Sequence, residues 1–247
     1  MLRKAFQAVL ILAALGALGL TATWVLGSFR ARGDISLRPR EKAGRTFSVS
    51  ETLSHGEREE AVRWAGDYVE EILEVREGRP SRVRRSYVSA LMDHTGPPAP
   101  KPLDAVVLLD DAGVREEASG EPFARALVSW PDPFSDLLPA RPVHNYSEWT
   151  LPAGAAARAA SFLARETVRA ARGEAKLEPE ETREGLPMRR VRVALEADLE
   201  DARTLRAWAD LFVAPGGLLL DVQWLGTIDG KKGEIRLDYL RKRQPRK

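Results

Sequence analysis

The stretch that decides the fold is "GLLLDVQWLGTIDGKKGEIRLDYLRKR", residues 217–243. Two runs of alternating apolar and polar residues flank a segment containing Asp229 and Gly230, a pair favoured where a tight turn needs positive φ. The stretch therefore predicts a β-hairpin. Its first strand carries one apolar face, and apolar residues of the second strand lie across the turn from it: Leu218, Leu220, Val222 and Trp224, then Ile235, Leu237 and Tyr239.

The pattern upstream of the hairpin predicts the fold class. Apolar residues recur at helical spacing from Pro152 to the stop at Gly173, and again over residues 199–212. Two strands, "AKLEP" and "RRVRVALEA", lie between these expected helices. The order is helix, strand, strand, repeated once. Two such units bury their apolar faces by forming a four-stranded sheet with both helices on one side, so we expect an α+β domain built from two αββ units.

In that arrangement one sheet face stays open although it carries apolar residues. An open face of this kind is typical of an interaction surface, and we expect it to bind a partner. The predicted partner interface consists of Leu219, Leu225, Leu240, Asp221 and Arg236. The alternative is that residues 55–130 of the same chain fold back over this face.

The chain divides into four predicted parts. Residues 1–29 form a membrane anchor and residues 30–50 a polar juxtamembrane linker. Residues 51–143 form a small α/β subdomain, with helices expected over 54–77 and 82–92 and a buried strand at "DAVVLL". Residues 144–247 form the α+β domain, which ends in a basic tail.

The membrane prediction rests on "AFQAVLILAALGALGLTATWVLGSF", residues 5–29, which contain no formal charge. This stretch is long enough to span a bilayer once as a helix, and a cleaved signal is the alternative. Small residues at spacing four, Ala13, Ala17 and Thr21, could let a second helix approach. We expect an inner-membrane protein whose soluble region is periplasmic or extracytoplasmic, although the basic residues after the span would by themselves favour the cytoplasm.

The segment "VRVALEADLEDARTLRAWADLF", followed by the hairpin, resembles the C-terminal part of two families of single-span inner-membrane proteins. These are the M protein of type II secretion and the O protein of type IV pili, and the similarity covers Pro152–Arg243. The resemblance implies a circularly permuted ferredoxin-like domain. It also implies a scaffold that forms homo- or hetero-oligomers with similar single-span subunits.

No catalytic, cofactor or metal motif is visible. The sequence lacks cysteine, and its three histidines, His55, His94 and His144, lie in separate segments that we expect to be exposed to solvent. Lys and Arg number 38 against 36 acidic residues, with no basic stripe for nucleic acid. We therefore expect a non-enzymatic scaffold or assembly subunit of a secretion or pilus-type machinery, with no small-molecule substrate. The alternative is a sensory or regulatory module in which residues 105–121 help to bind a ligand.

Overall fold

The computed structural model describes residues 34–38, 40–56, 61–95, 101–110, 113–116, 132–230 and 233–246. Contacts between Cα atoms divide the chain into two units, Met1–Ile35 and Ser36–Lys247. The fold described below is that of the second unit.

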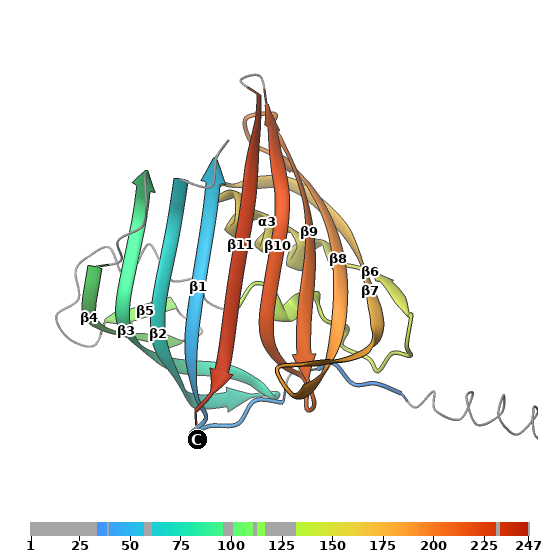
Figure 1. Cartoon of the computed structure of the whole chain (residues 1–247). Helices are drawn as coiled ribbons and strands as arrows, with labels where there is room; N and C mark the ends of the chain where they lie inside the picture. Colours follow the sequence, from blue (N-terminus) through green and yellow to red (C-terminus); the bar gives the residue numbers. More distant parts are fainter. Residues whose placement is uncertain are drawn as a thin grey trace, which may run out of the picture. The chain divides into compact units, whose positions relative to one another are not determined.

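The second unit is built on one antiparallel sheet of eleven strands (Figure 1). Their bounds are β1 Thr46–Gly56, β2 Ala61–Arg76, β3 Arg79–Thr95, β4 Lys101–Asp110, β5 Gly113–Glu116, β6 Glu148–Thr150, β7 Val168–Arg183, β8 Leu186–Leu199, β9 Thr204–Ala214, β10 Leu218–Gly230 and β11 Gly233–Pro245.

The order of strands in the sheet is β5-β4-β3-β2-β1-β11-β10-β9-β8-β7-β6. Strands β1 to β5 and β6 to β11 each pair in sequence order, as two meanders, and the pairing of β1 with β11 joins them into one sheet with β5 and β6 at its edges. The predicted hairpin is confirmed as β10 and β11, and Trp224 lies directly opposite Tyr239 in their register. This junction places the last strand of the sheet at its middle.

Helix α3, Ala153–Ala164, lies against one face of the sheet, which we call the inner face (Figure 1). The short 3-10 helix η1, Ser135–Leu137, contacts α3. Phe134, just before η1, packs on the rings of Phe162, Trp224 and Tyr239, with centroids 5.1–5.8 Å away. This aromatic cluster forms the centre of the core, and the opposite, outer face of the sheet carries most of the polar side chains.

The sequence of α3 explains its close packing on the sheet. Pro152 precedes the helix, where its fixed φ suits a helix start, and Arg165 ends it in the left-handed conformation with φ of 58°. Alanine has the highest helix propensity and a side chain short enough for close approach. The buried face of the helix consists of Ala155, Ala156, Ala159, Ala160, Leu163 and Ala164.

The prediction of an α+β ferredoxin-like domain is wrong. The structure has one large antiparallel sheet and, among the described residues, a single α-helix. The second predicted helix, residues 199–212, is the turn before β9 and most of β9 itself. Leu205 and Ala209 fit both a helical and an alternating pattern. The buried run that continues through Leu211 and Val213 fits only the strand, and strands β8 and β10 on either side settle the conformation.

Other predicted helices are also strands. Residues 54–77 and 82–92 fall mainly in β2 and β3, where Tyr68, Glu70 and Ile72 alternate with exposed or half-buried residues. The helix expected from residue 152 to 172 stops at Ala164, and β7 starts at Val168. The resemblance to the type II secretion M and type IV pilus O proteins is contradicted with it, because two αββ units are not present in this sheet.

The predicted membrane anchor over residues 5–29, with its small-residue stripe at Ala13, Ala17 and Thr21, lies outside the described residues. In the part of the chain that the structure describes, no helix has the length and apolar character needed to cross a bilayer. The expectation of a single-span membrane protein is therefore unsupported by the structure.

Candidate functional site: a cavity lined by buried charges

Charged side chains line the inner face of β1, β2, β3 and β11, where apolar residues would be expected. Alternation along each strand directs every second side chain inward. On β2 and β3 this places Glu70 directly opposite Arg85 in the register. On β11 it sends Arg241 and Arg243 inward beside Tyr239. All four of these charged residues are less than a tenth exposed, so the strands bury a group of charges together.

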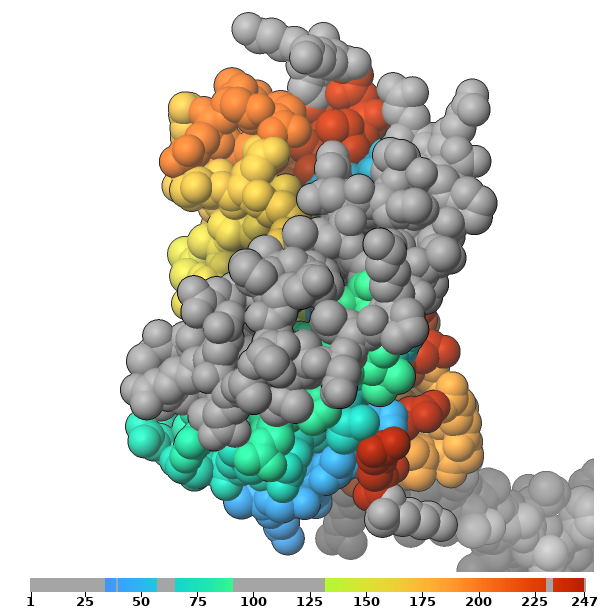
Figure 2. Space-filling model, turned by 90° about the vertical axis from the view of Figure 1, so that its left-hand side faces the viewer, coloured from blue at the N-terminus to red at the C-terminus, as the bar shows by residue number. Residues whose placement is uncertain are grey.

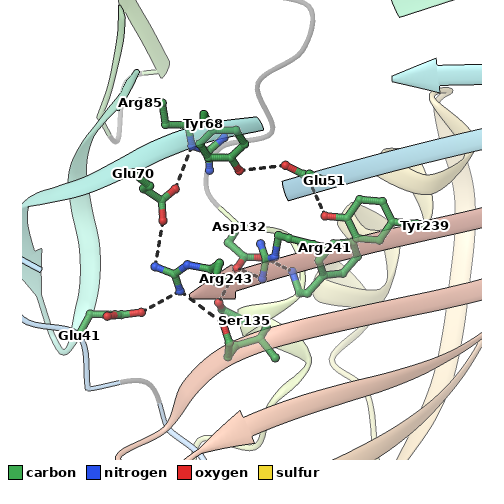
Figure 3. Close-up of polar contacts among 12 residues, drawn as sticks. Glu41, Glu51, Tyr68, Glu70, Arg85, Asp132, Ser135, Tyr239, Arg241 and Arg243 are labelled. Carbon is green, nitrogen blue, oxygen red and sulfur yellow. Dashed lines mark hydrogen bonds and ion pairs between the residues drawn. The ribbon is translucent and has the colours of Figure 1, made fainter. Parts of the chain in front are cut away.

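A chain of ion pairs connects three strands to the segment before β1 (Figure 3). Arg85 Nε donates to Glu70 Oε2 over 2.9 Å, and Arg243 Nη2 donates to Glu70 Oε1 over 2.9 Å. The other terminal nitrogen, Arg243 Nη1, lies 3.0 Å from Glu41 Oε1. The Arg243 guanidinium also stacks over the Phe47 ring, with Cζ 4.0 Å from the centroid. One arginine on the last strand therefore holds two carboxylates from distant parts of the sequence.

A second group forms around Glu51 and Asp132 (Figure 3). Glu51 accepts hydrogen bonds from the hydroxyls of Tyr68, at 2.9 Å, and Tyr239, at 2.5 Å. Arg241 Nη2 lies 2.8 Å from Asp132 Oδ2, and Asp132 Oδ1 accepts the backbone N–H of Phe134 over 2.9 Å. Asp132 lies in the segment just before η1 and binds Arg241 of β11, so these bonds hold that segment against the sheet.

The pKa values in this cluster follow from burial and pairing. Burial alone would raise the pKa of Glu70, but the positive charges of Arg243 and Arg85 outweigh it and hold that pKa below its ordinary value. The same balance, with Arg241 as partner, lowers the pKa of Asp132. Burial raises the pKa of Tyr87 to about 12. At neutral pH these carboxylates are therefore ionised and this phenol is protonated.

The charges line a cavity of about 570 Å³. Its inner end is formed by Glu41, Glu70, Arg85, Arg241 and Arg243, and its outer end by the exposed β2–β3 turn and by residues near Arg38. In Figure 2 the segments containing these outer residues, coloured blue and teal, lie side by side on the surface. The cavity therefore joins a buried polar interior to solvent.

Several polar atoms in this cavity have no hydrogen-bond partner among the described residues. They are Glu41 Oε2, Ser81 Oγ, Arg241 Nε and Arg243 Nε. Glu41 and Ser81 are 7% and 5% exposed. A buried polar group without a partner destabilises the folded state by about 1–3 kcal/mol. The cavity therefore gathers several buried donors and acceptors that no described residue satisfies.

The chemistry of the lining favours binding over catalysis. Glu70 and Asp132 are held ionised by arginines, so they are poor proton donors at neutral pH. Among the described residues there is no group of three or more acidic, histidine or cysteine side chains that could hold a metal ion. Six arginines face five carboxylates in the lining, so the cavity carries almost no net charge. It is suited to a polar molecule without a large charge of its own.

Sequence reasoning did not find this cavity. The arginines at the end of β11 were expected in a basic tail, and the segment that forms β2 was expected to be a helix. The available signal was alternation, since Leu237, Tyr239, Arg241 and Arg243 are two residues apart and therefore share one face of a strand. The neighbouring glutamates of the same sheet could be recognised only once its register was known.

The predicted partner interface is divided between the two faces. A β-bulge between Leu219 and Asp221 reverses the alternation, so Leu219 points inward, is 2% exposed, and lines the cavity. Asp221 is also buried, with Arg183 Nε 3.4 Å from its Oδ2. Leu225, half-exposed Leu240 and exposed Arg236 lie on the outer face as expected. Whether this face binds a partner stays a prediction.

The position of His55 also differs from expectation. Instead of lying exposed on a helix, it is on β1 and buried, with Nε2 2.7 Å from the carbonyl oxygen of Leu163. This carbonyl belongs to the last turn of α3, where helical carbonyls lack partners within the helix. His55 therefore ties the helix to the sheet. His144 is exposed as predicted, and the side chain of His94 lies outside the described residues.

Comparison with known proteins adds little to this geometry. No family profile matches the chain, and no curated protein sequence matches it. A solved structure from Bacteroides fragilis, of a protein classed as exported and with a YmcC-like fold, is similar at 11% identity and a TM-score of 0.32. The match covers 87% of this chain and 100% of that one. The function of the cavity is therefore inferred from its own residues.

Proposed function

We propose that this chain is a non-enzymatic ligand-binding protein, whose cavity on the inner face of β2, β3 and β11 holds a small polar molecule. The observation that carries the proposal is the set of buried polar atoms that no described residue satisfies. They include a carboxylate oxygen at Glu41 and guanidinium N–H groups at Arg241 and Arg243. The ligand that fits them offers both hydrogen-bond donors and acceptors, as polyols and zwitterionic amino acids do.

A binding role agrees with how the cavity is built. Its buried charges are held by ion pairs, as in the pairing of Arg243 with Glu41 and Glu70, so the site is formed before a ligand arrives. Its volume of about 570 Å³ lies within the range usual for small-molecule sites. We place this activity outside the cytoplasm, an expectation supported by the uncharged segment after Arg3 and Lys4.

Ser81 offers a direct test. Its hydroxyl lines the cavity and has no partner among the described residues, so Ser81→Val removes a ligand contact without breaking an existing bond. The matched control is Ser86→Val on the same strand, because residue 86 is offset from the inward series of Ser81, Val83 and Arg85 and points to the outer face.

The measurement is thermal unfolding of the full-length chain with a panel of neutral polyols and zwitterionic amino acids. A ligand at about 100 times its Kd stabilises the folded state by about 2.7 kcal/mol, which raises Tm by several degrees. We expect at least one compound to raise Tm in the wild type and in Ser86→Val, and to lose most of this effect in Ser81→Val. If no compound raises Tm, or if both variants respond like the wild type, the cavity is not the binding site.

A further inference from the structure

The outer face of the sheet carries an exposed apolar strip that the cavity does not explain. Trp208 on β9 and Leu225 on β10 are directly opposite each other and are 57% and 51% exposed. Ala194 on β8 lies opposite Trp208 on its other side. Because alanine is short, one face of the indole stays open, and a hollow of about 700 Å³ extends over this area.

The strip runs across the strands rather than along them. The register places one row of side chains from β7 to β11 in the order Glu174, Ala194, Trp208, Leu225, Asp238. At the usual strand spacing of about 4.8 Å, the row across five strands is about 19 Å long, and its apolar middle over β8, β9 and β10 is about 10 Å long between two acidic ends. This length suits an extended chain molecule rather than a single small ring.

A row of mostly polar side chains flanks the strip on each side. The row towards one end of the strands reads Lys176, Arg192, Asp210, Gln223, Leu240, and the row towards the other end reads Arg172, Glu196, Arg206, Thr227, Arg236. Both rows start with charged groups of mixed sign. A second hollow, of about 420 Å³, lies on the side of the second row and is also lined by Trp208.

The charges in these rows are largely paired, either within a row or with neighbouring residues outside it. Arg190 holds Asp210 through two bonds, Nε to Oδ1 at 2.8 Å and Nη2 to Oδ2 at 2.5 Å. Lys176 Nζ lies 2.9 Å from Glu148 Oε1, and Arg172 Nε donates to Glu196 over 2.9 Å. A nucleic acid or an anionic membrane needs uncompensated basic groups, and the pairing leaves few. An uncharged partner fits this surface better.

We propose that this outer strip binds a neutral oligosaccharide. The rings of a sugar chain have faces of C–H groups and edges of hydroxyls. The C–H faces pack on the open indole of Trp208 and on Leu225, where aromatic and aliphatic surface is exposed. The hydroxyls on both edges reach the flanking rows, whose planar guanidinium and carboxylate groups donate and accept hydrogen bonds in pairs.

The test uses the full-length chain and three neutral hexasaccharides, cellohexaose, maltohexaose and N-acetylchitohexaose, measured by isothermal titration calorimetry. We expect at least one to bind, and Trp208→Ala to weaken it about tenfold or more, the scale of loss when a stacked ring loses its aromatic platform. Val88→Ala is the matched control, because Val88 is an exposed apolar residue of β3 away from the strip. Trp208→Ala should leave Tm unchanged, since the side chain is largely exposed.

Four outcomes would overturn the proposal. None of the hexasaccharides binds, Trp208→Ala binds as tightly as the wild type, or a sulfated heparin hexasaccharide binds more tightly than every neutral one. The fourth is concentration-dependent dimerisation that Trp208→Ala abolishes, which would identify the strip as an interface between copies of the chain. Sugar binding that persists in Ser81→Val separates this site from the cavity on the inner face, so each proposal can fail without the other.

Discussion

The two halves of the sheet bury different kinds of side chain on the same inner face. Over β8, β9 and β10 the inward residues are apolar, as in the series Leu205, Ala207, Ala209 and Leu211, and α3 lies on this face of the sheet. Over β1, β2, β3 and β11 the same alternation turns glutamates, arginines and tyrosines inward. The strands are continuous in one ladder, so backbone pairing does not account for the difference.

The comparison separates stability from function. Apolar burial stabilises a fold roughly in proportion to the area removed from water. Buried ion pairs stabilise little on balance, because the cost of removing charges from water offsets their attraction. An apolar replacement of the charged half would therefore fold at least as well. The charges are better explained by the polar molecule that we propose for their cavity than by stability.

The largest effect is expected where one charge is removed from the middle of the cluster. Arg243→Met leaves Glu41 and Glu70 buried with less compensation, and should lower the free energy of unfolding by about 3–5 kcal/mol. Urea unfolding followed by circular dichroism measures the loss. Adding Glu41→Gln and Glu70→Gln to the same chain should recover part of it. A triple variant as unstable as Arg243→Met would mean that the unpaired carboxylates are not the cause.

A slightly smaller effect is expected in the apolar half. Leu163→Ala removes a fully buried side chain from α3 and should cost about 3 kcal/mol through lost burial and the cavity left behind. The same urea measurement applies. This loss should be independent of pH between 5 and 8, unlike that of Arg243→Met. A cost below about 1 kcal/mol would show that α3 is only loosely packed on the sheet.

Acid should weaken the charged half selectively. Glu70 and Asp132 have pKa values below their ordinary ones, so the unfolded chain binds protons at these groups more readily than the folded protein. Their contribution to stability is present above the unfolded pKa values and is lost as the pH falls through the folded ones. We expect the urea midpoint of the wild type to decrease from about pH 5 downward. The decrease should be less steep in Arg243→Met than in Leu163→Ala, because Arg243 is one of the charges that lower the pKa of Glu70. Equal slopes would contradict this.

Alkali should act on the same half through its phenols. Burial raises the pKa of Tyr87 to about 12, and raises the pKa values of Tyr68 and Tyr239 well above 10. A raised pKa contributes stability below the unfolded value, and this is lost as the pH rises through the folded one. Ultraviolet titration should show these three phenols ionising only as the protein unfolds. Their ionisation in the folded protein near pH 10 would contradict the burial.

The smallest effect is expected at an exposed pair. Arg172 bonds Glu196 on the outer face, and both side chains are open to solvent, which screens the interaction. Arg172→Ala should leave the urea midpoint within experimental scatter. A clear loss would mean that charge pairing stabilises this sheet wherever it occurs, and the contrast between its two halves would disappear.

The sequence predicts those parts of the fold that local patterns determine. The β10–β11 hairpin was predicted from alternation and the Asp229-Gly230 pair, which the register places at the end of β10 just before the turn, and the start of α3 from Pro152 and the alanines. The second helix was wrong because Leu205 and Ala209 suit both periodicities, and only the pairing of β9 with β8 and β10 decides between them. Without the sheet, the local pattern was ambiguous.

The cavity depends on contacts that no local pattern contains. Arg243 binds Glu41 and Glu70 across sequence separations of 202 and 173 residues. Its position depends on the pairing of β1 with β11, which joins the ends of the sheet's sequence. The outer strip was partly predicted, because Leu225 was recognised as exposed on an open face. Trp208 was missed, because residues 199–212 were expected to form a helix.

The pairing of β1 with β11 also affects how the protein forms during synthesis. Four acidic residues of the charged half are translated long before Arg241 and Arg243. They are Glu41, Glu51, Glu70 and Asp132. The two arginines form ion pairs with three of these acids, and Arg241 lies opposite the fourth, Glu51, in the sheet. Until the last strand is made, the edges of β1 and β10 both stay open, and Glu70 has Arg85 as its partner. A nascent chain interrupted before residue 233 would thus hold two separate meanders that cannot join, and chaperones or proteases could recognise it by those unpaired edges.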